Sequence, residues 1–111
     1  MASTEPSVTT LISVVVPFRN ESRYIAACAE SLLAQTYPAE AYELLFVDNN
    51  SRDDSSQIVA SFPRIGLLHE DKPGAYVARN RGLREARGSI VAFTDADCVV
   101  APDWLQQVAA G

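Results

Sequence analysis

The sequence predicts an α/β fold built on a parallel sheet with helices on both faces. Four short apolar runs recur along the chain without the polar alternation of a half-solvated strand. A segment with apolar residues at helical spacing follows each run. Parallel strands need a crossover between them, so strands that alternate with helices are typical of a parallel sheet.

Length and composition limit the classes of protein to consider. The chain has 111 residues, the size of one small domain, and its 48% hydrophobic and 21% charged residues are ordinary for a globular protein. Its formal net charge is −5, from 9 basic and 14 acidic residues. A nucleic-acid binder needs a basic face, so this charge argues against a nucleic-acid partner.

The N-terminal residues and the cysteines indicate a cellular compartment. Residues 1–10 are polar and rich in Ser and Thr, which predicts a disordered leader and not a signal peptide. The longest apolar runs are far too short to span a bilayer. Cys28 and Cys98 lack metal-ligand spacing and are interpreted as free thiols. We therefore expect a cytoplasmic protein.

The first strand is predicted over Leu11–Val16, a β-branched run that Pro17 closes. Ser22 is a suitable N-cap for the helix that follows, because its hydroxyl can accept from an unpaired amide of the first turn. That helix is predicted to end before Pro38. Its apolar residues are Tyr24, Ile25, Cys28, Leu32 and Leu33.

The second and third strands are predicted over Leu44–Val47 and Ile65–His69. Between them, Ser51 and Asp54 have the spacing of a capping box. The short helix that they would start has an inner face formed by Ile58, Val59 and Phe62.

The last part of the chain repeats the alternation. A loop at residues 72–74 precedes a helix predicted over Ala75–Arg87, and Gly88 is expected to stop this helix. The fourth strand is predicted over Ile90–Thr94. Residues 102–103, a Pro-Asp pair, open a final helix.

Two carboxylates, Asp95 and Asp97, follow the fourth strand. If the extended chain continued, both side chains would point the same way and would suit a hard cation such as Mg²⁺ or Mn²⁺, which in turn holds a diphosphate. The same residue types also occur in ordinary turns, so Asp95 could satisfy loop amides and Asp97 could cap a turn.

The position of these acids agrees with the expected place of a ligand. In a parallel sheet flanked by helices, ligands lie beyond the carboxyl ends of the strands, where the strand order reverses. Residues 17–21, 48–51 and 95–97 each follow a predicted strand. We therefore expect these three segments to meet at one site.

Four local signatures stand in a fixed order: Val14–Glu21, Phe46–Ser51, Gly74–Gly82 and Phe93–Asp97. Together they resemble the donor-binding half of family 2 glycosyltransferases, over about residues 11–108. The resemblance implies a Rossmann-like parallel sheet of about four strands, in the order 3-2-1-4 and flanked by helices. Residues 11–111 would then form part of a GT-A domain from which the acceptor-binding half is missing.

The resemblance implies roles for residues around the nucleotide base. The carboxylate that ends the second strand, here Asp48, would contact the base or the ribose. The loop after the first strand would wall the base pocket through Pro17, Phe18 and Asn20, with Glu21 beside it. From the residues alone, Asp48 could equally cap the helix that follows its strand.

Other implied roles concern the ribose, the diphosphate and a metal. Gly74 would let the backbone approach the donor, and Arg79 would lie near the base or the phosphates, which a guanidinium suits. Asp95 would face the ribose. Asp97 would hold a divalent cation, Mn or Mg, that bridges the diphosphate.

These roles imply a metal-dependent, inverting transfer of a sugar from a nucleotide-diphosphate donor, a UDP-sugar in particular, to an unknown acceptor. Inverting members place a catalytic base well after the metal motif, and nothing after Asp103 stands at that spacing. The alternative is a fragment that binds nucleotide and metal without catalysis. A nucleotidyltransferase would want a glycine-rich loop after the first strand, and residues 17–21 contain no glycine.

Some residues have structural interpretations or depart from the family pattern. Gly82 lies in mid-helix, where a close contact between helix and sheet explains it, and Cys98 is interpreted as a small buried side chain. Asn49 and Asn50 stand where the family often has another acid and a glycine. This change lowers the negative charge near the base.

Two expectations concern the whole protein. Without later strands to cover it, the strand at residues 90–94 would form an open apolar edge that promotes self-association. A longer natural protein could be peripheral to the inner face of a membrane, as many family members are.

Overall fold

The computed structural model describes residues 9–111, and in it four strands form one parallel sheet in the order β3-β2-β1-β4. This confirms the α/β class and the strand order 3-2-1-4. The strands are β1 (Ile12–Phe18), β2 (Tyr42–Asp48), β3 (Ile65–His69) and β4 (Ile90–Phe93). Of the predicted leader at residues 1–10, residues 1–8 lie outside the described part of the chain.

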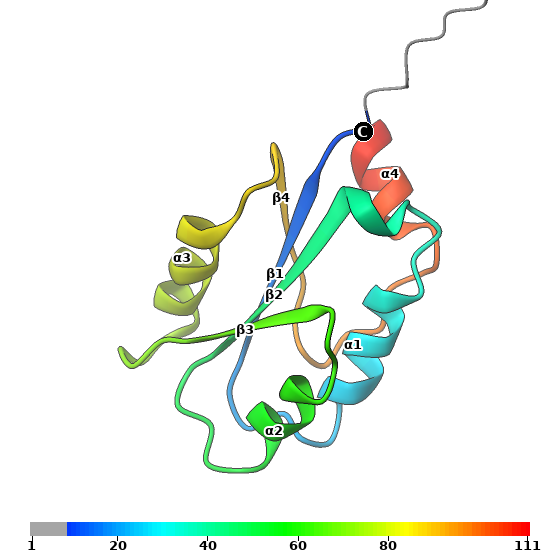
Figure 1. Ribbon diagram of the computed structural model, residues 1–111. Coiled ribbons are helices and arrows are strands. Elements are labelled where there is room, and N and C mark those ends of the chain that lie inside the picture. The colour runs from blue at the N-terminus through cyan, green and yellow to red at the C-terminus, as the bar shows by residue number, and fades with distance from the viewer. Residues whose placement is uncertain (1–8) are drawn as a thin grey trace, which may run out of the picture.

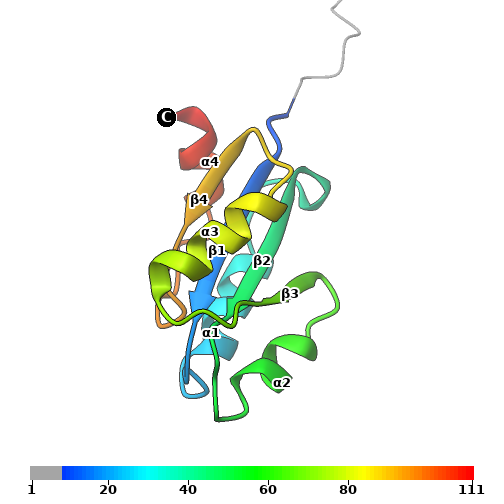
Figure 2. The ribbon, with the colours of Figure 1, turned by 90° about the vertical axis from the view of Figure 1, so that its left-hand side faces the viewer.

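Helices cover both faces of the sheet (Figure 1). One face packs against α3 alone, and Figure 2 shows this helix in front of β1 and β2. The other face packs against the remaining helices. Among the helices of residues 9–111, none has the length and apolar character needed to cross a membrane. The helical elements are α1 (Ile25–Leu33), η1 (a 3-10 turn, Ala39–Ala41), α2 (Ser55–Ala60), α3 (Ala75–Glu85) and α4 (Trp104–Ala110).

The central strand β1 explains the unbroken apolar pattern of the sequence. It lies between β2 and β4 in the sheet and has a helical layer on each face. Val14 and Val16 belong to the larger core cluster with α1, while Val15 belongs to the smaller cluster with α3. Because successive side chains point to opposite faces and both faces are covered, apolar residues are required at every position.

Gly82 allows α3 to approach the sheet closely. A Cβ atom added at Gly82 would lie 2.4 Å from Cγ1 of Val15, which is closer than side-chain atoms approach one another. This contact confirms the interpretation of Gly82 as a close approach between helix and sheet.

Two strands extend beyond their predicted ends. β1 continues through Pro17 to Phe18, so Pro17 does not close it, and β2 reaches Asp48. β4 pairs with β1 only as far as Val15. Within the described residues, position 17 therefore has a paired strand on the β2 side only. A proline is tolerated there because no strand on the β4 side requires its N–H.

The predicted starts of α3 at Ala75 and of α4 after residues 102–103 are confirmed, but the capping residues predicted for α1 and α2 are wrong. α1 begins at Ile25, with Tyr24 as its N-cap residue, and the backbone N–H of Ser22 donates to Asp53 at 3.2 Å. The predicted capping box at Ser51 is replaced by Asp53, whose carboxylate accepts from the backbone N–H of Ser55 at 3.0 Å. The group before α1 comes from across the fold, 31 residues away, whereas the group at α2 is local but differs from the residue that the capping-box spacing indicates.

Gly88 does not stop α3, which ends at Glu85 before Ala86 takes an extended conformation. A Cβ atom at Gly88 would lie 2.6 Å from the backbone nitrogen of Ser13. Gly88 is therefore required by a crossing close to β1 and not by helix termination.

Candidate functional site

A cavity of about 400 Å³ lies at the carboxyl ends of the strands. The segment that ends β1, the residue after β2, the start of α3 and the turn after β4 all contribute to it. Its lining residues are Pro17, Phe18, Arg19, Glu21, Asn49, Gly74, Ala75, Arg79, Asp95, Ala96 and Asp97. The strand ends expected to meet at one site therefore do so.

Most of the predicted site residues line this cavity. Of nine, all within the described part of the chain, seven are in the lining, and the other two are Asn20 and Asp48. Asn20 has a φ of 54° and accepts from the backbone N–H of Arg52 at 2.7 Å, while its own N–H donates to Oγ of Ser51 at 2.9 Å. In this structure Asn20 thus joins the loop after β1 to the loop after β2.

The carboxylate of Asp48 is engaged by the loop that follows β2. It accepts from the backbone N–H of Ser51 at 2.9 Å and from the hydroxyl of Ser56. Burial raises the pKa of this carboxyl. Hydrogen bonds from Ser56 and Ser51, together with the nearby His69, lower the pKa by more than burial raises it, so it lies below its usual value. Asp48 is 6% exposed, and its contacts are those of a residue that holds the start of α2.

Asn49 lies in a segment expected at the site, but no binding role was predicted for it; in the structure it lines the cavity. It is 5% exposed, and its side chain bonds three backbone groups of the loop between β3 and α3. The alternation of side chains at a strand end is the signal that could have identified it, because Asp48 and Asn49 cannot both face the same side. Arg19, Ala75 and Ala96 line the cavity as well.

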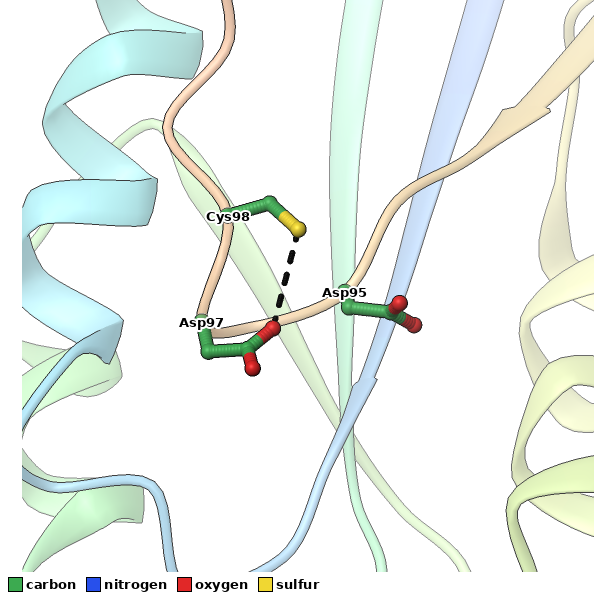
Figure 3. A group of neighbouring side chains, drawn as sticks. All are labelled: Asp95, Asp97 and Cys98. Atoms are coloured by element: carbon green, nitrogen blue, oxygen red, sulfur yellow. Dashed lines mark hydrogen bonds between the residues drawn. The ribbon is translucent and has the colours of Figure 1, made fainter.

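The acidic end of the cavity is a turn that follows β4. β4 ends at Phe93, and the N–H of Cys98 donates to the carbonyl of Asp95 at 3.0 Å, so the extended chain does not continue. Asp95, Asp97 and Cys98 nevertheless each offer a ligand atom, and these atoms lie within 4.8 Å of one another. Figure 3 shows the Cys98 thiol directed at the Asp97 carboxylate, at 3.6 Å.

Cys98 is half-buried and faces the acidic turn, so it is more accessible than the buried side chain that the sequence predicts. Both cysteines are free, as predicted. Burial, together with Cys98 and the nearby carboxylates, raises the pKa of the Cys28 thiol to about 12, so this thiol stays protonated.

The acidic turn is bonded by a side chain of α1. The thiol of Cys28 donates to the carbonyl of Asp95 at 3.6 Å. The side-chain amide of Gln35, two residues after α1, donates to the carbonyl of Ala101 at 2.7 Å and accepts from the N–H of Leu105 at 2.9 Å. A side chain of α1 and one from just after it therefore hold the segment from the acidic turn to the start of α4.

The cavity lining carries charges of both signs. Burial raises the pKa of Glu21, and the neighbouring Asp97, Asp53 and Asp95 raise it further. Arg19 and Arg79 also line the cavity. The three lining carboxylates favour a cation, and the guanidinium groups favour an anion such as a phosphate.

Comparison with known proteins extends these observations. A family model described as glycosyl transferase family 2 matches residues 13–110. Glycosyltransferase AglE of Haloferax volcanii is 37% identical over 112 residues, which cover 96% of this chain and 36% of that protein. The uncharacterized glycosyltransferase YibD of Escherichia coli is 40% identical over 98 residues, covering 85% of this chain and 28% of that protein.

Solved structures show the same fold. S. aureus TarS in complex with UDP superposes with a TM-score of 0.82 at 31% identity, covering 90% of this chain and 31% of that one. The mannosyltransferase PcManGT from Pyrobaculum calidifontis, in complex with GDP-Man and Mn²⁺, gives a TM-score of 0.81 at 32% identity, covering 91% and 32%. The chain spans about a third of the length of each of these four chains.

Proposed function

The chain belongs to glycosyltransferase family 2, and we propose that its cavity binds the nucleoside diphosphate of a sugar donor together with a divalent cation. The observation that carries this proposal is the cavity itself, which joins Asp95 and Asp97 to Arg19 and Arg79 at the strand ends. Its volume of about 400 Å³ lies within the range of small-ligand sites, roughly 300–1,000 Å³.

The donor atoms at the acidic end are suited to a divalent cation. Asp97 is assigned as the metal ligand, and Asp95 lies close enough to share the ion or to bind the ribose beside it. Both side chains are exposed, so neither carboxylate is already used in the core. When bound, Mn²⁺ or Mg²⁺ would stabilise the negative charge on the departing diphosphate.

The remaining lining residues have roles that follow from their positions. Pro17 and Phe18 line the cavity at the end of β1 and would form part of the wall of the base pocket. Gly74 and Arg79 line the cavity from the start of α3, and the guanidinium of Arg79 could donate to a base carbonyl or to a phosphate. Glu21 lies near the acids and would add negative charge toward the cation.

The reaction proposed for the full protein is transfer of the sugar, from a UDP-sugar in particular, to an acceptor hydroxyl. TarS is bound to UDP and UDP-GlcNAc in its structures, and PcManGT to GDP-Man and Mn²⁺. An inverting displacement would need a base within hydrogen-bond reach of the acceptor hydroxyl. The residues described here would contribute the donor side of that reaction.

The first test is calorimetric titration of the folded chain with UDP, and with GDP for comparison, in the presence of Mn²⁺ and again after chelation. We expect binding that depends on the metal. Asp97→Asn should weaken binding in Mn²⁺ by about tenfold or more, since a neutral amide is a poorer ligand for a hard cation. Asp54→Asn, at an exposed acid outside the cavity lining, is the control.

Two results would overturn the proposal. One is a chain that is folded by circular dichroism and binds neither nucleotide. The other is metal-dependent binding that Asp97→Asn leaves unchanged, which would remove Asp97 from the metal site.

A further inference from the structure

Asn49 holds together one wall of the cavity. Its side-chain NH₂ group donates to the carbonyl of Glu70 at 2.9 Å and to that of Lys72 at 2.7 Å. Its side-chain oxygen accepts from the N–H of Gly74 at 2.8 Å. One buried amide therefore bonds every second residue of the loop that joins β3 to α3. The two carbonyls and the one N–H also fix which end of the amide is oxygen.

Asn49 is itself fixed, so it can serve as an anchor. Its backbone N–H donates to the carbonyl of Phe18 at 2.9 Å, which ties it to the end of β1. The loop it holds is otherwise exposed from Asp71 to Gly74 and has little packing of its own. A loop without apolar contacts depends on hydrogen bonds for its order.

The loop ends at residues that line the cavity. Gly74 has a φ of 126° and is the N-cap residue of α3, while Ala75 and Arg79 lie in the first turns of that helix. A side chain that fixes the N–H of Gly74 therefore also fixes where the helix begins. The position of this wall is thereby set before a ligand arrives.

We propose that Asn49 is a positioning residue for the nucleotide: by holding residues 70–74 it presents Gly74, Ala75 and Arg79 to the ligand in their binding arrangement. The inference rests on the proposed function of the cavity. The inference also explains why an amide side chain is used at position 49, because a carboxylate could not donate to the carbonyls of Glu70 and Lys72.

The test compares substitutions at two adjacent asparagines that bond the same loop. Asn49→Ala removes three side-chain bonds. Asn50→Gly removes one exposed bond, from the Asn50 amide to the carbonyl of Asp71 at 2.8 Å, and is unstrained because Asn50 has a φ of 67°. Titration with UDP and Mn²⁺ is combined with hydrogen exchange at the Gly74 amide.

We expect Asn49→Ala to weaken UDP binding by about tenfold or more, because the ligand must then order the loop. The Gly74 amide should exchange faster in the same variant. Asn50→Gly should change the affinity by less than about twofold, because it removes only one exposed hydrogen bond.

A loss of overall stability must be separated from a loss of positioning. Ile12→Val, at the opposite end of β1 from the cavity, lowers stability without touching the loop, and it should leave the affinity for UDP unchanged. If Asn49→Ala does not fold, Asn49→Asp replaces it. This variant keeps an acceptor for Gly74 and loses both donors, and its readout is faster exchange of the Gly74 amide, because the added charge would weaken diphosphate binding by itself.

Each other outcome overturns the inference. Wild-type affinity in a folded Asn49→Ala with a protected Gly74 amide would do so, as would equal losses at positions 49 and 50, or a loss in Ile12→Val as large as that in Asn49→Ala. Failure of the wild-type chain to bind any nucleotide would overturn the proposed function, and the role of Asn49 in binding with it. Gly74 exchange in the variant would still show whether the loop is held by Asn49.

Discussion

At the end of β2, two neighbouring polar residues have different tasks. The Asp48 carboxylate bonds Ser51 and Ser56 and holds the start of α2, while Asn49 lines the cavity and holds the loop before α3. The family resemblance pointed to Asp48 for nucleotide contact, and that role stays a prediction. Residue type and strand position place both side chains at the correct edge of the sheet. Which of them enters the cavity depends on contacts with segments distant in the sequence.

The lowered pKa of Asp48 predicts a pH dependence of stability. Because the folded pKa lies below the ordinary value of 3.8, the unfolded state takes up the proton first as the pH falls. The stabilisation is therefore fully present well above pH 3.8 and is lost as the pH falls from there through the folded pKa. Asp48→Asn should lower the free energy of unfolding by about 1 kcal/mol at neutral pH and reduce the further loss in acid.

Urea unfolding at neutral pH and near pH 3 measures this effect. Asp71→Asn, at an exposed acid of the neighbouring loop, is the charge-matched control and should follow the wild-type profile. A profile for Asp48→Asn that parallels the wild type at every pH would contradict the assignment.

At the scale of elements, the strands and helices were predicted from apolar periodicity, and their capping groups were not. β1 and β2 each extend beyond the predicted run, and α1 begins three residues after Ser22. Just before α1, the N–H groups of Glu21 and Ser22 donate to Ser55 and Asp53, which lie 34 and 31 residues away along the chain. Local propensity defines an element's existence, whereas tertiary hydrogen bonds decide its ends.

The contact between α3 and β1 supports a prediction about packing. Helix propensity alone would make Gly82→Ala stabilising by roughly 1 kcal/mol. The added methyl would instead meet Val15 at 2.4 Å, so we expect a net loss of about 1–2 kcal/mol. Denaturant unfolding measures the change.

The double variant Gly82→Ala with Val15→Ala tests the cause. Removal of the Val15 methyl groups makes room for the new Cβ, so the two changes together should cost less than the sum of the single changes. Strict additivity, or a more stable Gly82→Ala, would show that the contact with Val15 is not limiting.

At the scale of the whole molecule, β4 is an edge of the sheet. Within residues 9–111 it pairs with β1 alone, and Phe93 at its end is 43% exposed. An apolar edge strand offers unpaired backbone groups to another chain. We therefore predict that the 111-residue chain self-associates as its concentration rises.

Sedimentation over a range of concentrations tests this prediction. Phe93→Lys places a charge on the edge and should shift the chain toward monomer. Leu83→Lys is the matched control, since Leu83 is 49% exposed but lies on α3 and should leave association unchanged. A monomer at high concentration in the wild-type chain would rule out the predicted edge contact.

The sequence by itself determined the class of the fold, the order of its elements and the strand ends at which the site lies. It could do so because apolar periodicity is local, and because the carboxyl ends of parallel strands meet at one edge. Only the tertiary structure decided the helix caps, the turn at Asp95 and Asp97, and the position of Asn49 in the cavity wall. The contacts of Ser22 with Asp53 and of Asn49 with Gly74 join residues 31 and 25 positions apart, and Cys28 bonds the turn at Asp95 from 67 positions away. Such partners meet only once the sheet has formed.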